Sequence, residues 1–288
     1  MTPLKSTMKR IIMSFLLAVC LLAMTVTRPT ESQASETARF RIVAGTTLIA
    51  DIVQDLLPGQ VDVITLIPAS SCPGHHDMRA TDMAFFSGSS LVLLHSWQKE
   101  QDSIVAAARS AGLPQERLKT VAARGSLLVP SNQIAASRKT AALLATLPDA
   151  DAITINKRLD ARIKRIETLS AASLASMAPY RKTPVLSAVM QEEFAHWLGL
   201  KIIGVYGRAE ELSPKTMMSL ASLGKKNDAR LVIDNDQSGA EAGLPLAREI
   251  GAAHVSFSNF PILVGNKSGY EGLVAENVRL LISALAQP

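Results

Sequence analysis

The sequence alternates short apolar runs with segments whose apolar residues recur every three or four positions. In the first half, the runs 39–47, 59–68 and 90–96 are typical of buried strands, and the segments 48–57 and 100–112 are typical of amphipathic helices. Continuously apolar strands that alternate with helices indicate a parallel sheet covered on both faces. The pattern therefore predicts an α/β fold.

The same alternation restarts after residue 183. Apolar runs at 183–188, 200–207, 229–236 and 254–261 predict strands, and segments at 190–199, 213–224, 243–251 and 272–285 predict helices. We therefore expect two α/β lobes, each a mainly parallel sheet with helices on both faces.

The segment 151–178 joins the two halves. Its apolar positions Ile155, Leu159, Ile163, Ile166 and Leu169 are three or four residues apart, and Pro179 follows the segment. This spacing predicts one long amphipathic backbone helix that connects the lobes. The expected division is an N-terminal lobe at 35–150, the connecting helix at 151–178 and a C-terminal lobe at 179–288.

The first 34 residues have the pattern of a secretory signal. A basic start precedes an apolar run at 11–24, which is shorter than the roughly 20 residues needed to cross a bilayer. Small residues end the segment, so we expect cleavage near Ala34 and a periplasmic or otherwise exported protein. Cys20 leaves a lipid anchor as an alternative.

Charge, cysteine content and missing motifs limit the classes of function that the sequence allows. The formal charge is +5, but four of the 30 basic side chains lie in the first 34 residues, so no nucleic-acid partner is expected. The exported chain keeps Cys72 as its one cysteine, which excludes an intrachain disulfide. Because hydrolase signatures such as G-x-S-x-G and H-E-x-x-H are absent from the sequence, we expect a binding protein, a monomer, and no enzymatic activity.

The loop "IPASSCPGHHDMRATD" at 67–82 gathers several metal-binding side chains. Cys72 and His75 stand three residues apart around a Pro-Gly turn, a spacing that lets one loop offer two borderline-soft donors to one metal. His76 points elsewhere if His75 points inward. Asp77 and Asp82 are interpreted as helix N-terminal caps rather than ligands.

Further polar residues follow other predicted strands. In parallel α/β sheets the loops after the carboxyl ends of the strands line the ligand crevice, so these residues are expected to share one cleft. His95 ends the run "SLVLLH", Asp234 and Asp236 lie in "DNDQSG", and Gln191 opens a helix. The predicted metal-ligating set is therefore His75, His95, Cys72, Asp234, Asp236 and Gln191.

The order of these segments carries a family resemblance. The chain has "GTT" after its first strand, then "LIP…CPGHHD…TD", "LVLLHSWQKE", a long helix, "EEFAHWLGL" and a late "NFP". In this order it resembles the zinc/manganese substrate-binding proteins of bacterial metal ABC importers, the cluster A-I family. The resemblance covers nearly the whole exported chain, and it implies two α/β lobes joined by a rigid helix with the metal between them.

The resemblance also implies a function and a ligand. The expected role is capture of a divalent transition metal, with zinc first and Mn²⁺ or Fe²⁺ open, for a membrane permease. His75 takes the place of the family's first ligand. The other three ligand positions fall near Gly125, Ala188 and Ser258, which offer no such donor, so His95 is predicted to replace the missing second histidine.

Two alternatives remain from the residues alone. The motif "CPGH" has the outline of a redox Cys-x-x-Cys site whose second sulfur is replaced, so Cys72 would serve a thiol redox protein. The segment Gly45 to Thr47, with "DNDQSG" and "SNF", would instead hold an oxyanion or an organic solute. A reductase assay beside a metal titration distinguishes the first alternative, and stabilisation of the metal-free protein by phosphate-like ligands identifies the second.

Overall fold

The computed structural model describes residues 40–76, 78–121, 125–263 and 269–286, which belong to one compact unit beginning at Ala38. The predicted signal peptide and Asp77 lie outside the described residues. The division into lobes at 150 and 178 stays a prediction.

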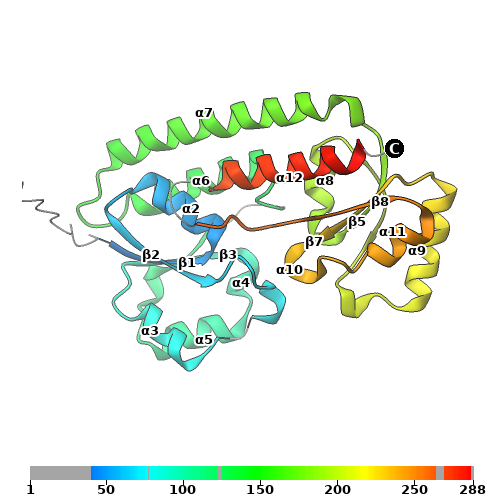
Figure 1. Ribbon diagram of the computed structural model, residues 1–288. Coiled ribbons are helices and arrows are strands. Elements are labelled where there is room, and N and C mark those ends of the chain that lie inside the picture. The colour runs from blue at the N-terminus through cyan, green and yellow to red at the C-terminus, as the bar shows by residue number, and fades with distance from the viewer. Residues whose placement is uncertain (1–39, 77, 122–124, 264–268, 287–288) are drawn as a thin grey trace, which may run out of the picture. The chain divides into compact units, whose positions relative to one another are not determined.

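Sheet A is formed by the first part of the unit (Figure 1). Its strands pair in the order β2-β1-β3-β4, and every pairing is parallel. The strands are β1 (Phe40–Thr46), β2 (Val61–Ile67), β3 (Leu91–His95) and β4 (Leu118–Val121), and the helices of this part are α2 (Thr47–Leu56), α3 (Met83–Phe86), α4 (Ser96–Lys99), α5 (Asp102–Ser110) and α6 (Pro130–Leu144).

Sheet B repeats this topology. Its order is β6-β5-β7-β8, again with parallel pairings throughout. The strands are β5 (Pro184–Ala188), β6 (Lys201–Tyr206), β7 (Leu231–Asn235) and β8 (Ala253–Phe257), and the helices are α8 (Glu192–Trp197), α9 (Pro214–Lys226), α10 (Asp236–Gly239), α11 (Leu244–Ile250) and α12 (Tyr270–Leu285). The predicted fold class, two parallel α/β sheets with a long connecting helix, is confirmed.

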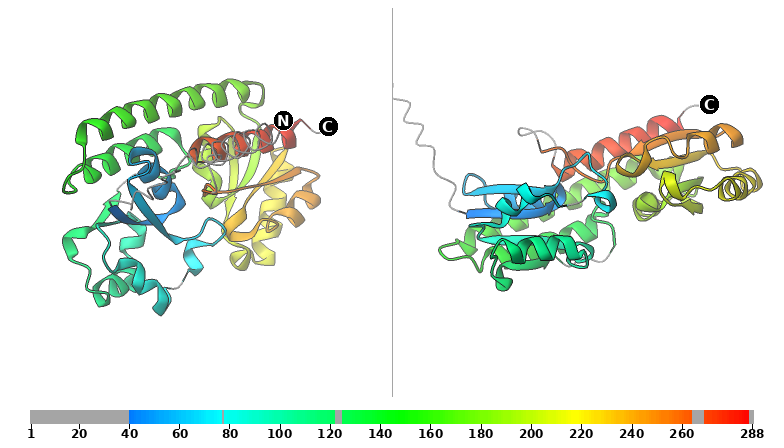
Figure 2. Two further views of the ribbon diagram at one scale, coloured as in Figure 1. Left: turned by 60° about the vertical axis from the view of Figure 1, so that its left-hand side comes forward. Right: turned by 90° about the horizontal axis from the view of Figure 1, so that it is seen from below.

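The connecting helix is α7 (Ala152–Ser176). Asp151 caps its start by accepting hydrogen bonds from the backbone N–H groups of Ile153 and Thr154. At 1.5 Å per residue its 25 residues span about 38 Å. Figures 1 and 2 show α7 running past both sheets, with α12 on the same side.

The main hydrophobic core is continuous from one sheet to the other. It joins Ile42 of β1 and Ile52 of α2 to Ile166 of α7, Val274 of α12 and Ile233 of β7. Two smaller clusters cover the opposite faces, one centred on Val43 and Leu94 and the other on Leu186 and Val232. The sheets are therefore linked by shared packing as well as by the chain.

Helix α6 has no counterpart in the prediction from sequence. Its buried face contains Gln133, Ser137 and Thr140 between small and apolar residues, so hydrophobic periodicity alone gives little signal. Pro130 at its first turn was the available sign of a helix start.

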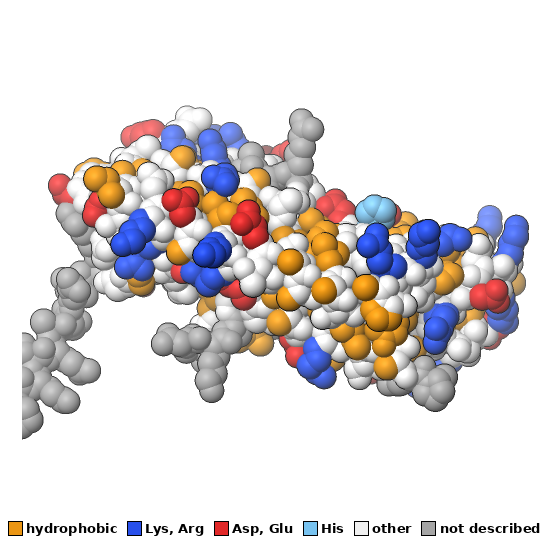
Figure 3. Space-filling view, turned by 90° about the horizontal axis from the view of Figure 1, so that it is seen from above, with side chains coloured by type: hydrophobic (Ala, Val, Ile, Leu, Met, Phe, Trp, Pro, Cys, Tyr) orange, Lys and Arg blue, Asp and Glu red, His pale blue; other side chains and the backbone are white. Residues whose placement is uncertain are grey.

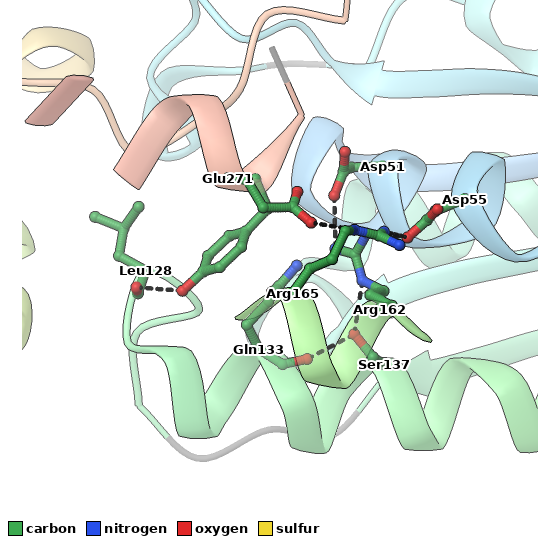
Figure 4. A network of polar contacts seen from close by, with 9 residues as sticks. Asp51, Asp55, Leu128, Gln133, Ser137, Arg162, Arg165 and Glu271 are labelled. Atoms are coloured by element: carbon green, nitrogen blue, oxygen red, sulfur yellow. Dashed lines mark hydrogen bonds and ion pairs between the residues drawn. The ribbon is translucent and has the colours of Figure 1, made fainter. Parts of the chain in front are cut away.

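The polar face of α6 supports a buried ion network between α2, α7 and α12 (Figure 4). The Arg162 side chain is 1% exposed and donates to Asp51 Oδ2 at 2.6 Å, to Asp55 Oδ2 at 2.9 Å and to Ser137 Oγ at 3.1 Å. Arg165 pairs with Asp55 and with Glu271 of α12. Burial raises the pKa of the Asp51 carboxyl, against the opposing effect of Arg162.

The face above α7 and α12 carries a mixed surface (Figure 3). Acidic, basic and apolar side chains all occur on it, and basic side chains gather toward its right-hand end in this view. None of the described helices is both long enough and apolar enough to cross a membrane.

Candidate functional site

A cavity of about 500 Å³ lies between the carboxyl ends of the two sheets. Each of the eight described strands has a lining residue at its carboxyl end or in the segment that follows it. Sheet A contributes Leu48 after β1, 72–74 after β2, 95–97 at the end of β3, and Val121 at the end of β4 with 125–128 beyond it. Sheet B contributes Val189, Met190 and Glu193 after β5, Arg208 after β6, Asn235, Gln237 and Ser238 at the end of β7, and 259–260 after β8. The expectation that strand ends share one cleft is therefore met by the fold.

His95 lies in the lining at the end of β3 and is 8% exposed. Its Nε2 lies 2.7 Å from Thr46 Oγ1 at the end of β1, and its ring stacks on Trp97 with centroids 5.4 Å apart. Burial lowers the pKa of His95 to about 4. The imidazole is therefore neutral at pH 7, as a metal ligand must be.

Gln98 holds the backbone around His95. Its Oε1 accepts a hydrogen bond from the His95 N–H at 3.0 Å, and its Nε2 donates to the Gly45 carbonyl at 3.0 Å. A Cβ at residue 45 would lie 1.9 Å from Gln98 Oε1, so the absence of a side chain at Gly45 is what lets the two strand ends approach. This explains part of the "GTT" motif by packing.

The Cys72 to His75 loop forms the rim of the cavity. The Cys72 thiol is free, half-buried and in the lining. His75 is exposed in a 3₁₀ turn (Pro73–His75), where its Nε2 lies 3.1 Å from Glu210 Oε1. The ring nitrogen Nε2 of His76 is buried without a hydrogen-bond partner in the described structure.

Asp234, Asp236 and Gln191 have other partners. The buried Asp234 carboxylate accepts hydrogen bonds from Tyr206 Oη at 2.7 Å and the Gly243 N–H at 2.8 Å, and it lies 2.7 Å from His254 Nε2. Asp236 accepts from Ser256 Oγ. Gln191 Nε2 donates to the Phe257 carbonyl at 3.2 Å and to Asn259 Oδ1 at 2.9 Å, while its Oε1 is buried without a partner in the part of the chain that the structure describes.

Cys72 and His95 are thus the two members of the predicted set that the described lining contains. Across the part of the chain that the structure describes, no group of three or more His, Cys, Asp and Glu side chains is arranged to hold a metal ion. Asp82 accepts a hydrogen bond from the Arg79 N–H at 2.8 Å, which fits its interpretation as a capping residue.

Several lining residues were not predicted from the sequence. Arg208 lies two residues after the end of β6, a position that could have identified it, and its Nε is buried without a hydrogen-bond partner among the described residues. Glu193 is exposed and lies on the rim, where its Oε2 accepts from the Ser126 N–H at 2.5 Å. Gln237 Nε2 donates to the Ala69 carbonyl at 2.9 Å. These contacts join the two sides of the cavity.

Two parallel sheets with the same strand order, a backbone helix shared between them and one cavity at their carboxyl ends define a class of two-lobed α/β protein. Within that class, residues 42–284 match the family described as ZnuA, zinc-uptake complex component A, periplasmic. The chain belongs to this family. Gly125, near which the resemblance places the family's second histidine, lies in the cavity lining.

Solved structures give the same fold at low sequence identity. A crystal structure of ZnuA is 17% identical, with a TM-score of 0.73 over 86% of this chain and 99% of that chain. The SBP FpvC from Pseudomonas aeruginosa in complex with Mn²⁺ is 20% identical, with a TM-score of 0.73 over 86% and 98%. The periplasmic zinc binding protein TroA from Treponema pallidum is 16% identical, with a TM-score of 0.70 over 86% and 100%. No curated protein sequence matches the chain.

Proposed function

We propose that this chain is an exported solute-binding protein that captures a divalent transition metal, zinc first, and delivers it to the membrane permease of an ABC importer. One observation carries the proposal: in a chain of the zinc-uptake family, all eight described strand ends meet at one cavity that contains a thiol and a neutral imidazole. The proposal includes a periplasmic location, with removal of the signal peptide near Ala34, and a binding role rather than catalysis.

The proposed protein donors are the Cys72 thiolate and the His95 imidazole. A mixed sulfur and nitrogen set favours Zn²⁺, which is bound most often in tetrahedral geometry. His75, Asp234, Asp236 and Gln191 remain predicted donors. Each of them would have to leave a present partner, such as Glu210 for His75 or Tyr206 for Asp234.

Metal content and metal-dependent stability test this function together. Protein purified from periplasm without chelators should carry a transition metal by elemental mass spectrometry. At a zinc concentration about 100 times the dissociation constant, a ligand bound only by the folded state stabilises it by roughly 2.7 kcal/mol, which a thermal melt detects. Melting temperatures unchanged by zinc, manganese and iron would reject metal capture.

Variants of single histidines test the donors. His95→Ala should weaken zinc binding by more than the roughly 10–100-fold typical of a residue that only supports a ligand, measured by competition with a zinc chelator. His196→Ala, an exposed change on α8, is the matched control and should leave the affinity unchanged. If His75→Ala is as damaging as His95→Ala, the loop must rearrange on binding; if His95→Ala is silent, His95 is no ligand.

A further inference from the structure

The cavity is larger than a single ion needs, and part of its lining is apolar. Ligand pockets of about 300–1,000 Å³ suit small organic molecules, and the cavity of about 500 Å³ lies in that range. Three of the large apolar side chains exposed on the unit are concentrated in its lining, namely Trp97 at 38%, Val189 at 44% and Met190 at 42% exposed. Exposed carbon surface gathered at a cavity is typical of a site that binds a partly apolar ligand.

The charge in the lining favours a ligand that carries a carboxylate. The guanidinium of Arg208 lies against Gly74 of the opposite rim, because a Cβ at residue 74 would be 2.0 Å from Arg208 Nη2. Its Nε is buried and has no hydrogen-bond partner among the described residues. Arginine binds carboxylates through two parallel N–H groups, so a guanidinium in the lining suits an anionic ligand.

The acid on the same rim is already engaged. Glu193 Oε2 accepts a hydrogen bond from the Ser126 N–H. A bare divalent cation entering the cavity would meet a positively charged guanidinium in the lining, whereas a cation that brings its own anionic ligand would offer that guanidinium a partner.

The two proposed protein donors leave positions on the metal for a second molecule. If zinc is bound by the Cys72 thiolate and the His95 imidazole, a tetrahedral ion has two positions left, which oxygen atoms of a second molecule can fill. We propose that the ligand is a divalent metal already complexed by a small organic polycarboxylate. Cys72 and His95 bind the metal, Arg208 binds a carboxylate that the metal leaves free, and Trp97 and Met190 cover the carbon skeleton. This inference rests on the proposed function, whose metal site it shares.

The test is calorimetric titration of the full exported chain, stripped of metal, with three probes at pH 7: Zn²⁺ alone, citrate alone, and the Zn²⁺–citrate complex. One charge-assisted carboxylate contact corresponds to about a tenfold gain in affinity or more, so the complex should bind at least about tenfold more tightly than either component. In Arg208→Gln the ratio between the complex and Zn²⁺ alone should fall to about one.

Two further variants test whether the gain in affinity depends on Arg208 in particular. Gly74→Ala should reproduce the loss, because the added Cβ displaces the Arg208 guanidinium while residue 74 needs no left-handed backbone. Arg248→Gln, an exposed change on α11, is the matched control and should keep the full gain.

The possible results distinguish a failure of this inference from a failure of the proposed metal capture. Tight binding of Zn²⁺ alone, with citrate merely competing for the ion and Arg208→Gln without effect on the ratio, overturns the inference and leaves metal capture intact. Citrate alone binding as well as the complex overturns it in favour of a metal-independent anion site. If neither Zn²⁺ nor its complex binds, the proposed function fails as well.

Discussion

At the scale of single residues, burial determines the chemistry of His95. The ring is enclosed by Thr46 and Trp97, and loss of water contact lowers its pKa from the ordinary 6.5 to about 4. A metal ligand of this kind stays neutral well below pH 6. The sequence predicts loss of metal affinity through the usual histidine range, and for His95 burial moves that loss to lower pH.

The same shift predicts how the stability of the metal-free protein depends on pH. Between about pH 4 and 6.5 the unfolded chain binds a proton on this histidine and the folded chain does not, so stability is complete above 6.5 and falls as pH decreases toward 4. From pH 6.5 to 5 the loss from this residue should be about 2 kcal/mol in urea unfolding. His95→Gln should lack that component, and an identical pH slope in both proteins would contradict the assignment.

At the scale of elements, the ends of β1 and β3 depend on one close approach. Gln98 bridges the Gly45 carbonyl and the His95 N–H, and the space that it occupies is where a side chain at residue 45 would stand. One buried amide therefore bridges the ends of the two strands, in addition to their parallel pairing and the contact between Thr46 and His95.

Gly45→Ala should be destabilising by about 1–3 kcal/mol, because the added methyl group overpacks the Gln98 side chain, and it should weaken zinc binding through His95. The double variant Gly45→Ala, Gln98→Ala should cost less than the sum of the single changes by at least about 0.5 kcal/mol, since truncating Gln98 removes the side chain with which the added methyl group clashes. Urea midpoints of the four proteins measure this coupling, and strict additivity would refute the steric explanation.

At the scale of the whole unit, the Arg162 network joins helices from distant parts of the chain (Figure 4). Asp51 and Asp55 come from α2, Arg162 and Arg165 from α7, and Glu271 from α12. Together with the core that runs between the sheets, these ion pairs connect both sides of the cavity through α7.

Arg162→Met should be destabilising by about 3–5 kcal/mol, because it leaves Asp51 buried without its partner. Arg165→Met, whose side chain is far more exposed, should cost about 1 kcal/mol or less and serves as the control. Adding Asp51→Asn to Arg162→Met should recover part of the loss, and equal thermal midpoints for the two single variants would contradict a network centred on Arg162.

Local patterns in the sequence determined the fold. Strand and helix alternation and the three-to-four spacing at Ile155 to Leu169 depend on residues close together in the chain, so both sheets and α7 were predictable. Helix α6 was not, because its buried face includes the polar residues Gln133, Ser137 and Thr140, and Ser137 accepts from Arg162 of α7, a contact that no local period reveals.

The tertiary structure alone decided which predicted donors lie at the cavity. Asn235 lies in the lining, while Asp234, one residue earlier in β7, bonds Tyr206 and His254 instead. Successive side chains of a strand point to opposite faces, so a shift of one residue changes the face, and sequence patterns locate strand ends less finely than that. Arg208 and Gly74 likewise meet only because the loops after β6 and β2, distant in sequence, pack against each other.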